Sequence, residues 1–110
     1  MEHMITIDVS VIKANISKKI VNLKNKEITV GEKCINLRHI MYDLDLLYSG
    51  IKNPTIRKRI KVIANKLYFH NFYDLQVVEK INVDALEKVI MSILENIPNK
   101  PIPINWFTLT

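Results

Sequence analysis

The chain has 110 residues, of which 48% are hydrophobic and 25% charged, and its net charge is +5. This length and apolar fraction suffice for one hydrophobic core without disulfides or bound metal, which argues against intrinsic disorder. The single cysteine excludes an intramolecular disulfide. Two glycines in the whole chain exclude the glycine-rich loops that bind dinucleotides or nucleotide phosphates.

The first residues combine a short alternating segment with the start of a helix. Residues 5–11 alternate apolar and polar side chains, as a short strand does, and helical spacing then takes over at Asp8 or Ser10 and continues to about Leu23. This region lacks the basic segment and apolar core of a signal peptide, and no apolar run in the chain is long enough to span a membrane. We therefore expect a cytoplasmic protein.

Four segments carry apolar residues three or four positions apart, the spacing that places them on one face of a helix. The four stripes are Val9, Ile12, Ile16, Ile20 and Leu23; Val30, Cys34, Leu37, Met41, Leu44 and Tyr48; Ile56, Ile60, Ile63 and Leu67; and Leu86, Ile90, Ile93, Leu94 and Ile97. Each stripe needs a partner surface to leave water. The sequence therefore predicts helices packed against one another around a single core.

The second helix has a signal at each end. Thr29 and Glu32 have the spacing of a capping box, in which each side chain bonds the backbone N–H of the other residue. This spacing places the start of the helix near Val30. Gly50 is expected to end the helix, because glycine readily takes the left-handed conformation that follows many helices.

Asparagines precede the remaining helical segments. Asn53 is followed by Pro54, and this pair is typical of a helix start because Asn caps free N–H groups and Pro loses no hydrogen bond there. The helices are then expected over residues 54–69, 71–80 and 83–97, with Asn71 and Asn82 as the further caps.

Pro98 is expected to stop the last helix. Residues 99–110 contain two prolines and the only Trp, so they form a stiff, extended and apolar tail. Such a tail can pack on its own bundle, pair as a strand with residues 5–9, or dock in a partner. The sequence thus predicts an all-α antiparallel bundle of four to five helices over residues 1–98, with an extended tail over 99–110 and a small terminal strand pair as an alternative.

The sequence shows no constellation of catalytic or metal-binding residues. His3, His39 and His70 lie in different segments, and none has metal-ligand spacing with another His or with Cys34. Cys34 lies on an apolar stripe, which favours a structural thiol over a nucleophile. We therefore expect no enzyme activity, no cofactor and no metal.

Basic side chains gather around the third helix. Residues 1–70 hold thirteen Lys or Arg against six Asp or Glu, whereas residues 71–110 hold three against five. Gly50, Ile51 and Ile56 occupy positions that resemble the turn and apolar positions of a helix-turn-helix, and this resemblance implies DNA binding. The candidate nucleic-acid-binding residues are Lys52, Arg57, Lys58, Arg59 and Lys61.

Two simpler explanations of the basic residues stay open. Thirteen of the sixteen are Lys, and Ile, Lys and Asn together fill 42 of 110 positions, as an AT-rich coding sequence would produce. Selection for phosphate or base contacts usually favours Arg over Lys. An ordinary solvated helix face also fits the pattern.

The tail contains large apolar residues that belong to none of the four stripes. Ile104, Trp106 and Phe107 are therefore the candidate partner-binding residues, since exposed aromatic side chains often dominate protein interfaces. We expect the neighbouring helix surface to take part in the same contact.

Two families resemble parts of this plan. The small, basic four-helix arrangement with a C-terminal tail is similar to the bacteriocin immunity proteins, and residues 23–30 and 53–57 resemble the helical N-terminal domain of transcription elongation factors, which binds short disordered peptides. Both resemblances imply binding without catalysis. The predicted function is a non-enzymatic protein-binding module, a small regulator, inhibitor or adaptor, and the alternative is a nucleic-acid-binding regulator that uses the third helix.

Overall fold

A computed structural model describes the chain over residues 5–73 and 75–104, and it is mostly helical there. The elements in chain order are β1 (Ile5–Asp8), α1 (Val9–Leu23), α2 (Val30–Gly50), α3 (Pro54–Tyr73), α4 (Leu75–Glu79), α5 (Val83–Leu94) and β2 (Pro101–Ile104). The predicted bundle is confirmed, and so is the terminal strand pair.

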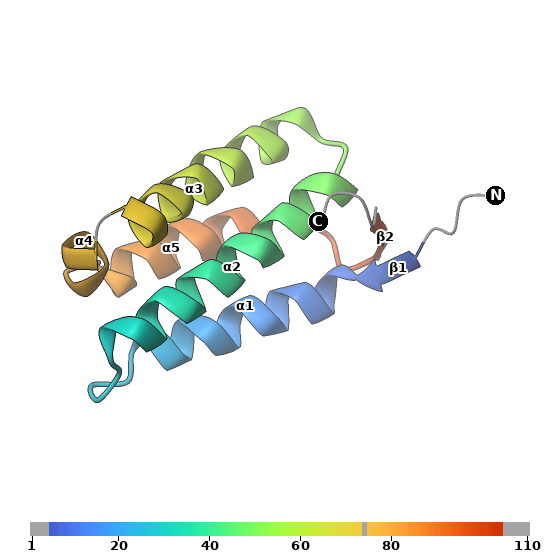
Figure 1. Cartoon of the computed structure of the whole chain (residues 1–110). Helices are drawn as coiled ribbons and strands as arrows, with labels where there is room; N and C mark the ends of the chain where they lie inside the picture. The colour runs from blue at the N-terminus through green and yellow to red at the C-terminus, as the bar shows by residue number, and fades with distance from the viewer. Residues whose placement is uncertain (1–4, 74, 105–110) are drawn as a thin grey trace.

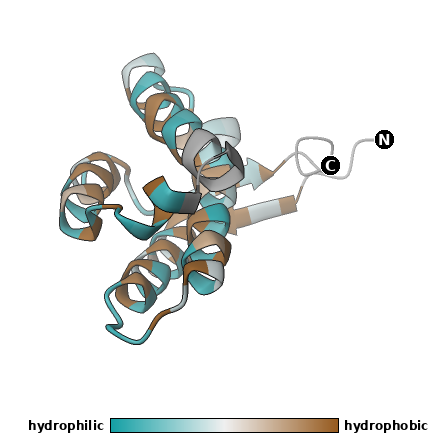
Figure 2. Ribbon diagram, turned by 60° about the vertical axis from the view of Figure 1, so that its left-hand side comes forward, coloured by the Kyte–Doolittle hydropathy of each residue, from teal (hydrophilic) through white to brown (hydrophobic). Residues whose placement is uncertain are grey.

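Successive long helices reverse direction. Figure 1 shows α1, α2 and α3 side by side, with α5 behind them, α4 at one end of the bundle and the two strands at the other. In Figure 2, which looks more nearly along the bundle, the helices carry both hydrophobic and hydrophilic residues around their circumference. This pattern is that of amphipathic helices, whose apolar faces meet inside.

Most of the predicted helix starts are confirmed. Asp8 Oδ1 accepts a hydrogen bond from Ser10 N at 2.9 Å, Asn53 Oδ1 accepts one from the N–H of Ile56 at 3.2 Å, and Asn82 caps α5 in the same way. Each cap satisfies an N–H group that has no partner inside its helix.

The capping box of α2 forms with one difference from the expected pattern. Thr29 Oγ1 accepts from the N–H of Glu32 at 3.1 Å, as expected. The Glu32 carboxylate, however, accepts from the Thr29 hydroxyl and not from its backbone N–H.

Three helix boundaries differ from the expectation. Asn71 lies inside α3, which continues to Tyr73, so it is not the cap of the following short helix. That helix, α4, is shorter than expected and begins only at Leu75. The last helix ends at Leu94, although Ile97 beyond its end is still buried.

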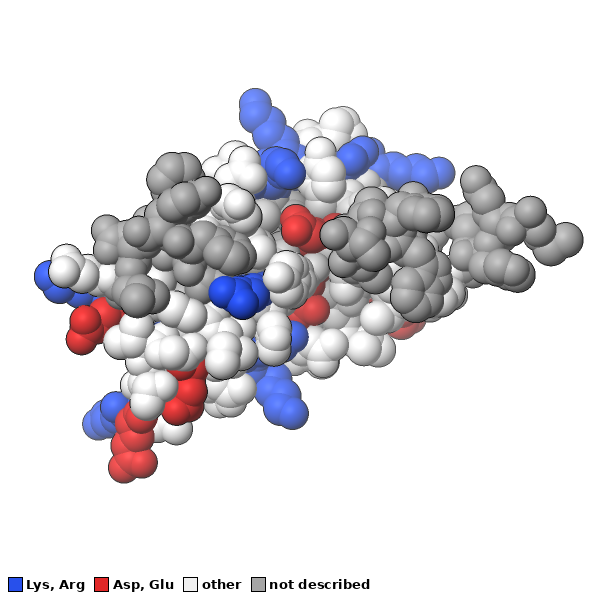
Figure 3. Space-filling view, in the orientation of Figure 1, with Lys and Arg blue, Asp and Glu red and all other residues white. Residues whose placement is uncertain are grey.

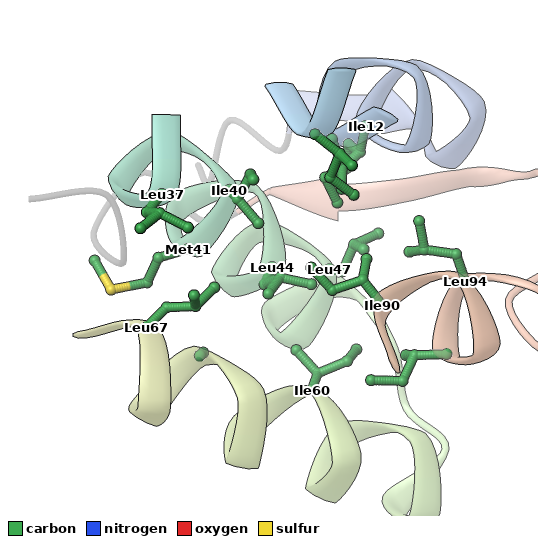
Figure 4. Close-up of a cluster of buried hydrophobic side chains, with 14 of the residues drawn as sticks. Ile12, Leu37, Ile40, Met41, Leu44, Leu47, Ile60, Leu67, Ile90 and Leu94 are labelled. Carbon is green, nitrogen blue, oxygen red and sulfur yellow. The ribbon is translucent and has the colours of Figure 1, made fainter. Parts of the chain in front are cut away.

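The core forms where the four stripes meet. The first stripe is buried at every position, and Figure 4 shows Leu44 and Leu47 of α2 beside Ile90 of α5, on the side of α2 that faces Ile60 of α3. Ile40 and Leu47 lie outside the predicted second stripe but are fully buried. The reason is that α2 packs against both α1 and α3 and therefore buries a wider face than one stripe.

The tail begins on its own bundle. β2 pairs with β1 in antiparallel register, with Ile7 opposite Ile102, and the N–H of Val9 donates to Lys100 O at 3.0 Å. Gly50 does not take the predicted left-handed conformation, since no glycine in the described residues has a positive φ. Glycine is required at this position for a different reason: Ile102 packs directly onto residue 50 and leaves no room for a Cβ atom.

Candidate binding surface on helix α3

The basic residues of α3 point in different directions. Successive residues of a helix are rotated by about 100°, so neighbouring basic residues cannot share one face. Arg57 and Lys61 lie over Tyr48 of α2, whereas Arg59 Nη2 donates to Ser92 Oγ of α5 at 3.1 Å. Lys52 lies in the loop before α3 and lines a cavity next to β2. The five candidate residues therefore do not form a single patch.

A cationic cleft lies between α2 and α3. The ring of Tyr48 forms part of its wall, with the guanidinium carbon of Arg57 4.3 Å from the ring centroid and Lys61 Nζ 5.4 Å from it. These distances are those of cation–π contacts. The cleft has a volume of about 420 Å³ and is lined by Tyr48, Pro54, Arg57, Lys58, Lys61, Val62 and Asn65.

The electrostatics of the cleft are strongly positive. Residues 46–73 contain six Lys or Arg and no Asp or Glu. Asp45 lies one turn before Tyr48 on α2. Partial desolvation raises the pKa of its carboxyl, and the charge of Lys61 opposes this shift. The Nε of Arg57 is buried and makes no hydrogen bond within the part of the chain that the structure describes.

An apolar groove lies on the other side of α3, against α5. It has a volume of about 270 Å³ and is lined by Lys58, Arg59, Val62, Ile63, Val89 and Ile93. Val62 and Val89 are 48% and 42% exposed. The groove therefore offers an apolar floor with two cations beside it.

The cleft and the groove share Lys58 and Val62 and so adjoin along α3. We call the two together the α3 surface. Figure 3 shows Lys and Arg side chains along the upper edge of the molecule, where Figure 1 places α3. The arrangement combines positive charge with exposed apolar area, which suits a binding partner that has acidic and apolar groups.

Of the three candidate partner-binding residues in the tail, the structure describes only Ile104. Ile104 is half-buried in β2, opposite Ile5 of β1. Trp106 and Phe107 lie outside the described residues, so their contact with a partner stays a prediction. A cavity of about 450 Å³ lies where β2 meets the end of α2 and the loop before α3.

The sequence reasoning missed two polar features. Tyr48 belongs to the predicted apolar stripe, yet its ring contacts two cations at the cleft. The signal in the sequence is the amphipathic nature of Tyr, which has an apolar ring and a polar hydroxyl. Lys19 Nζ of α1 and Asp43 Oδ2 of α2 form an ion pair at 2.6 Å, with only 21% and 11% of their side chains exposed. No local pattern marks this pair, because its members are 24 residues apart.

Residues 5–73 and 75–104 contain neither a metal-ligand cluster nor a membrane-spanning helix. Within these ranges, no group of three or more His, Cys, Asp or Glu residues is placed to hold a metal ion. In the same part of the chain, every helix is too short or too polar to cross a membrane. Cys34 is half-buried.

Comparison of the chain with protein-family models, with curated proteins and with solved structures gave no match. The function is therefore inferred from the chemistry of the α3 surface.

Proposed function

We propose that this protein is a non-enzymatic binding module, a small regulator, inhibitor or adaptor, and that it binds a protein partner through the α3 surface. The observation that carries the proposal is the apolar groove between α3 and α5, where exposed Val62 and Val89 lie beside Lys58 and Arg59. A segment with apolar side chains flanked by acidic ones is complementary to it in both respects.

The exposed area of the two valines in the groove determines how much binding free energy a partner can gain there. Fully burying a Val side chain contributes about 1.5–3 kcal/mol, and the two valines of the groove are already about half-covered. A partner that covers either valine therefore gains about 1 kcal/mol from it, which corresponds to roughly fivefold in affinity. Charge pairing with Lys58 and Arg59 adds orientation and a faster association rate.

A labelled amphipathic peptide, with leucines along one helical face and glutamates beside them, serves as the test probe. We expect it to bind more tightly than the same peptide with lysines in place of the glutamates. Val89→Ser should weaken binding about fivefold, whereas Val21→Ser, which changes a 65% exposed valine on α1, should leave it unchanged. Equal affinity for the two peptides, or equal effects of the two serine variants, would refute the proposal.

The predicted contribution of the tail is tested by truncation. Because Ile102 is buried against Gly50, the truncation must follow Ile104 and leave β2 in place. If Trp106 and Phe107 form a second contact, the shortened protein keeps its melting temperature and binds the partner more weakly. Unchanged binding would remove the tail from the proposal.

Nucleic-acid binding is the second candidate function, because the acid-free segment from residue 46 to residue 73 carries six basic residues. It would use Lys52, Arg57, Lys58, Arg59 and Lys61, and its affinity would fall steeply with salt as counterions are released. The measurement is binding of a panel of DNA and RNA oligonucleotides at low and high salt. Tight, salt-sensitive binding that Val89→Ser does not change would favour this candidate over the first.

A further inference from the structure

We propose that the cleft between α2 and α3 binds a phosphate monoester carried by a phosphorylated side chain of the partner protein. The inference rests on the proposed function and names the ligand of one part of the same surface. Three features of the cleft support it: a stacked guanidinium, an excess of charge that matches a dianion, and cations without acidic partners.

The first feature is the position of Arg57. Its guanidinium carbon lies 4.3 Å from the centroid of the Tyr48 ring, so the group is held against the ring by packing. Its Nε is buried and makes no hydrogen bond to any described residue. A guanidinium held in this way needs little further ordering to donate two parallel hydrogen bonds to an oxyanion.

The second feature is the charge balance. The cleft is lined by Arg57, Lys58 and Lys61 and by no acid among the described residues, and the carboxyl that the charge of Lys61 reaches is that of Asp45. Three positive charges and one negative charge leave an excess of two. A phosphate monoester carries about −1.5 to −2 at pH 7, whereas a carboxylate and a phosphodiester each carry one charge.

The third feature is that, among the described residues, these cations have no acidic partner within ion-pair distance. The ion pairs found within the described residues join Lys19 to Asp43 and Lys24 to Glu87, both away from the cleft. Lys61 lies 5.4 Å from the Tyr48 centroid, so it stands on the same ring as Arg57. A dianion between them would relieve the repulsion of two cations that share one aromatic surface.

The test titrates the full chain with N-acetyl-phosphoserine amide and follows the Arg57 Nε–H resonance by NMR. Dimethyl phosphate serves as the diester probe and N-acetyl-aspartate amide as the carboxylate probe. We expect the monoester to bind at least about tenfold more tightly than either, because it can form an additional charge-assisted contact. Its addition should shift the Arg57 resonance.

Arg57→Gln and Arg59→Gln make a matched pair, because each removes one positive charge from the same helix. Arg57→Gln should weaken monoester binding about tenfold, whereas Arg59→Gln, whose guanidinium bonds Ser92, should change it less than about threefold. Arg57→Lys keeps the charge but loses the planar fork, so it should recover only part of the affinity. Thermal denaturation of each variant checks that the fold persists.

The outcomes separate this inference from the proposed function. Equal monoester and diester affinities, or equal effects of Arg57→Gln and Arg59→Gln, would overturn it and leave only general attraction to anions. If the acidic peptide still depends on Val89 in that case, the proposed function stands without a phosphate site. Diester-bearing oligonucleotides that bind far more tightly than the monoester would point to nucleic acid instead.

Discussion

The two glycines of the chain both lie in α2, and the structure assigns them opposite responses to alanine. A Cβ at Gly50 would lie 2.6 Å from Ile102 Cδ1 and 2.9 Å from Ile102 Cβ. A Cβ at Gly31 would meet only Thr29 Oγ1, at 3.9 Å. The first substitution therefore overlaps with β2, whereas the second makes only an ordinary van der Waals contact.

The magnitudes follow from helix propensity and burial. Alanine in place of glycine stabilises a helix by about 0.5–1 kcal/mol, so Gly31→Ala should raise the melting temperature by about 2–4 °C. At Gly50 the same gain is outweighed, because the Cβ of Ile102 is fixed to the strand and β2 must move. Overpacking of this kind costs about 1–3 kcal/mol, and moving β2 also exposes part of a side chain that is now 1% exposed.

We expect Gly50→Ala to be destabilised by about 1–2 kcal/mol, which lowers the melting temperature by about 4–8 °C. Thermal denaturation followed by far-ultraviolet circular dichroism measures both variants under the same conditions. If Gly50→Ala melts at or above the wild-type temperature, the docking of β2 on α2 is wrong. Equal shifts for the two variants would contradict the argument as well.

Three other expectations follow from individual polar groups. Asp43→Ala leaves Lys19 partly buried without its ion-pair partner and should cost about 1–3 kcal/mol in urea denaturation, whereas Glu87→Ala, which removes an exposed pair, should cost much less. Partial desolvation raises the pKa of Asp45 above its ordinary 3.8, so its ionised form destabilises the fold; Asp45→Asn should match the wild type near pH 3 and melt at a higher temperature at pH 7. Thr29→Ala should cost about 1 kcal/mol through loss of the α2 cap, and no change in urea midpoint would show that the cap contributes nothing.

The sequence predicted the helix starts well because a cap is a local event. Thr29, Asn53 and Asn82 each bond an N–H group within three residues, so their neighbours in the chain carry all the information. Asn71 shows the limit of this reasoning. The same residue type lies inside α3, where the helix continues past it to Tyr73.

Contacts between residues far apart in the sequence could not be predicted. Gly50 suggested a left-handed end to α2, but its role is set by Ile102, more than fifty residues later. Similarly, the sequence placed Arg59 with the other basic residues, but its bond to Ser92 depends on where α5 lies beside α3. Local patterns therefore identified the basic residues of α3, but neither the direction of their side chains nor the part that Tyr48, Val62 and Val89 take in the surface.

Different residues of α3 stabilise the fold and form the proposed binding surface. Its inner residues Ile60 and Leu67 are buried in the core, whereas Lys58 and Val62 are exposed, so substitutions at the latter should alter binding and change stability by less than about 0.5 kcal/mol. Arg57 is the exception, since it is half-buried against Tyr48. A ligand that binds only the folded cleft must raise the melting temperature by mass action, and Arg57→Gln should remove most of that rise.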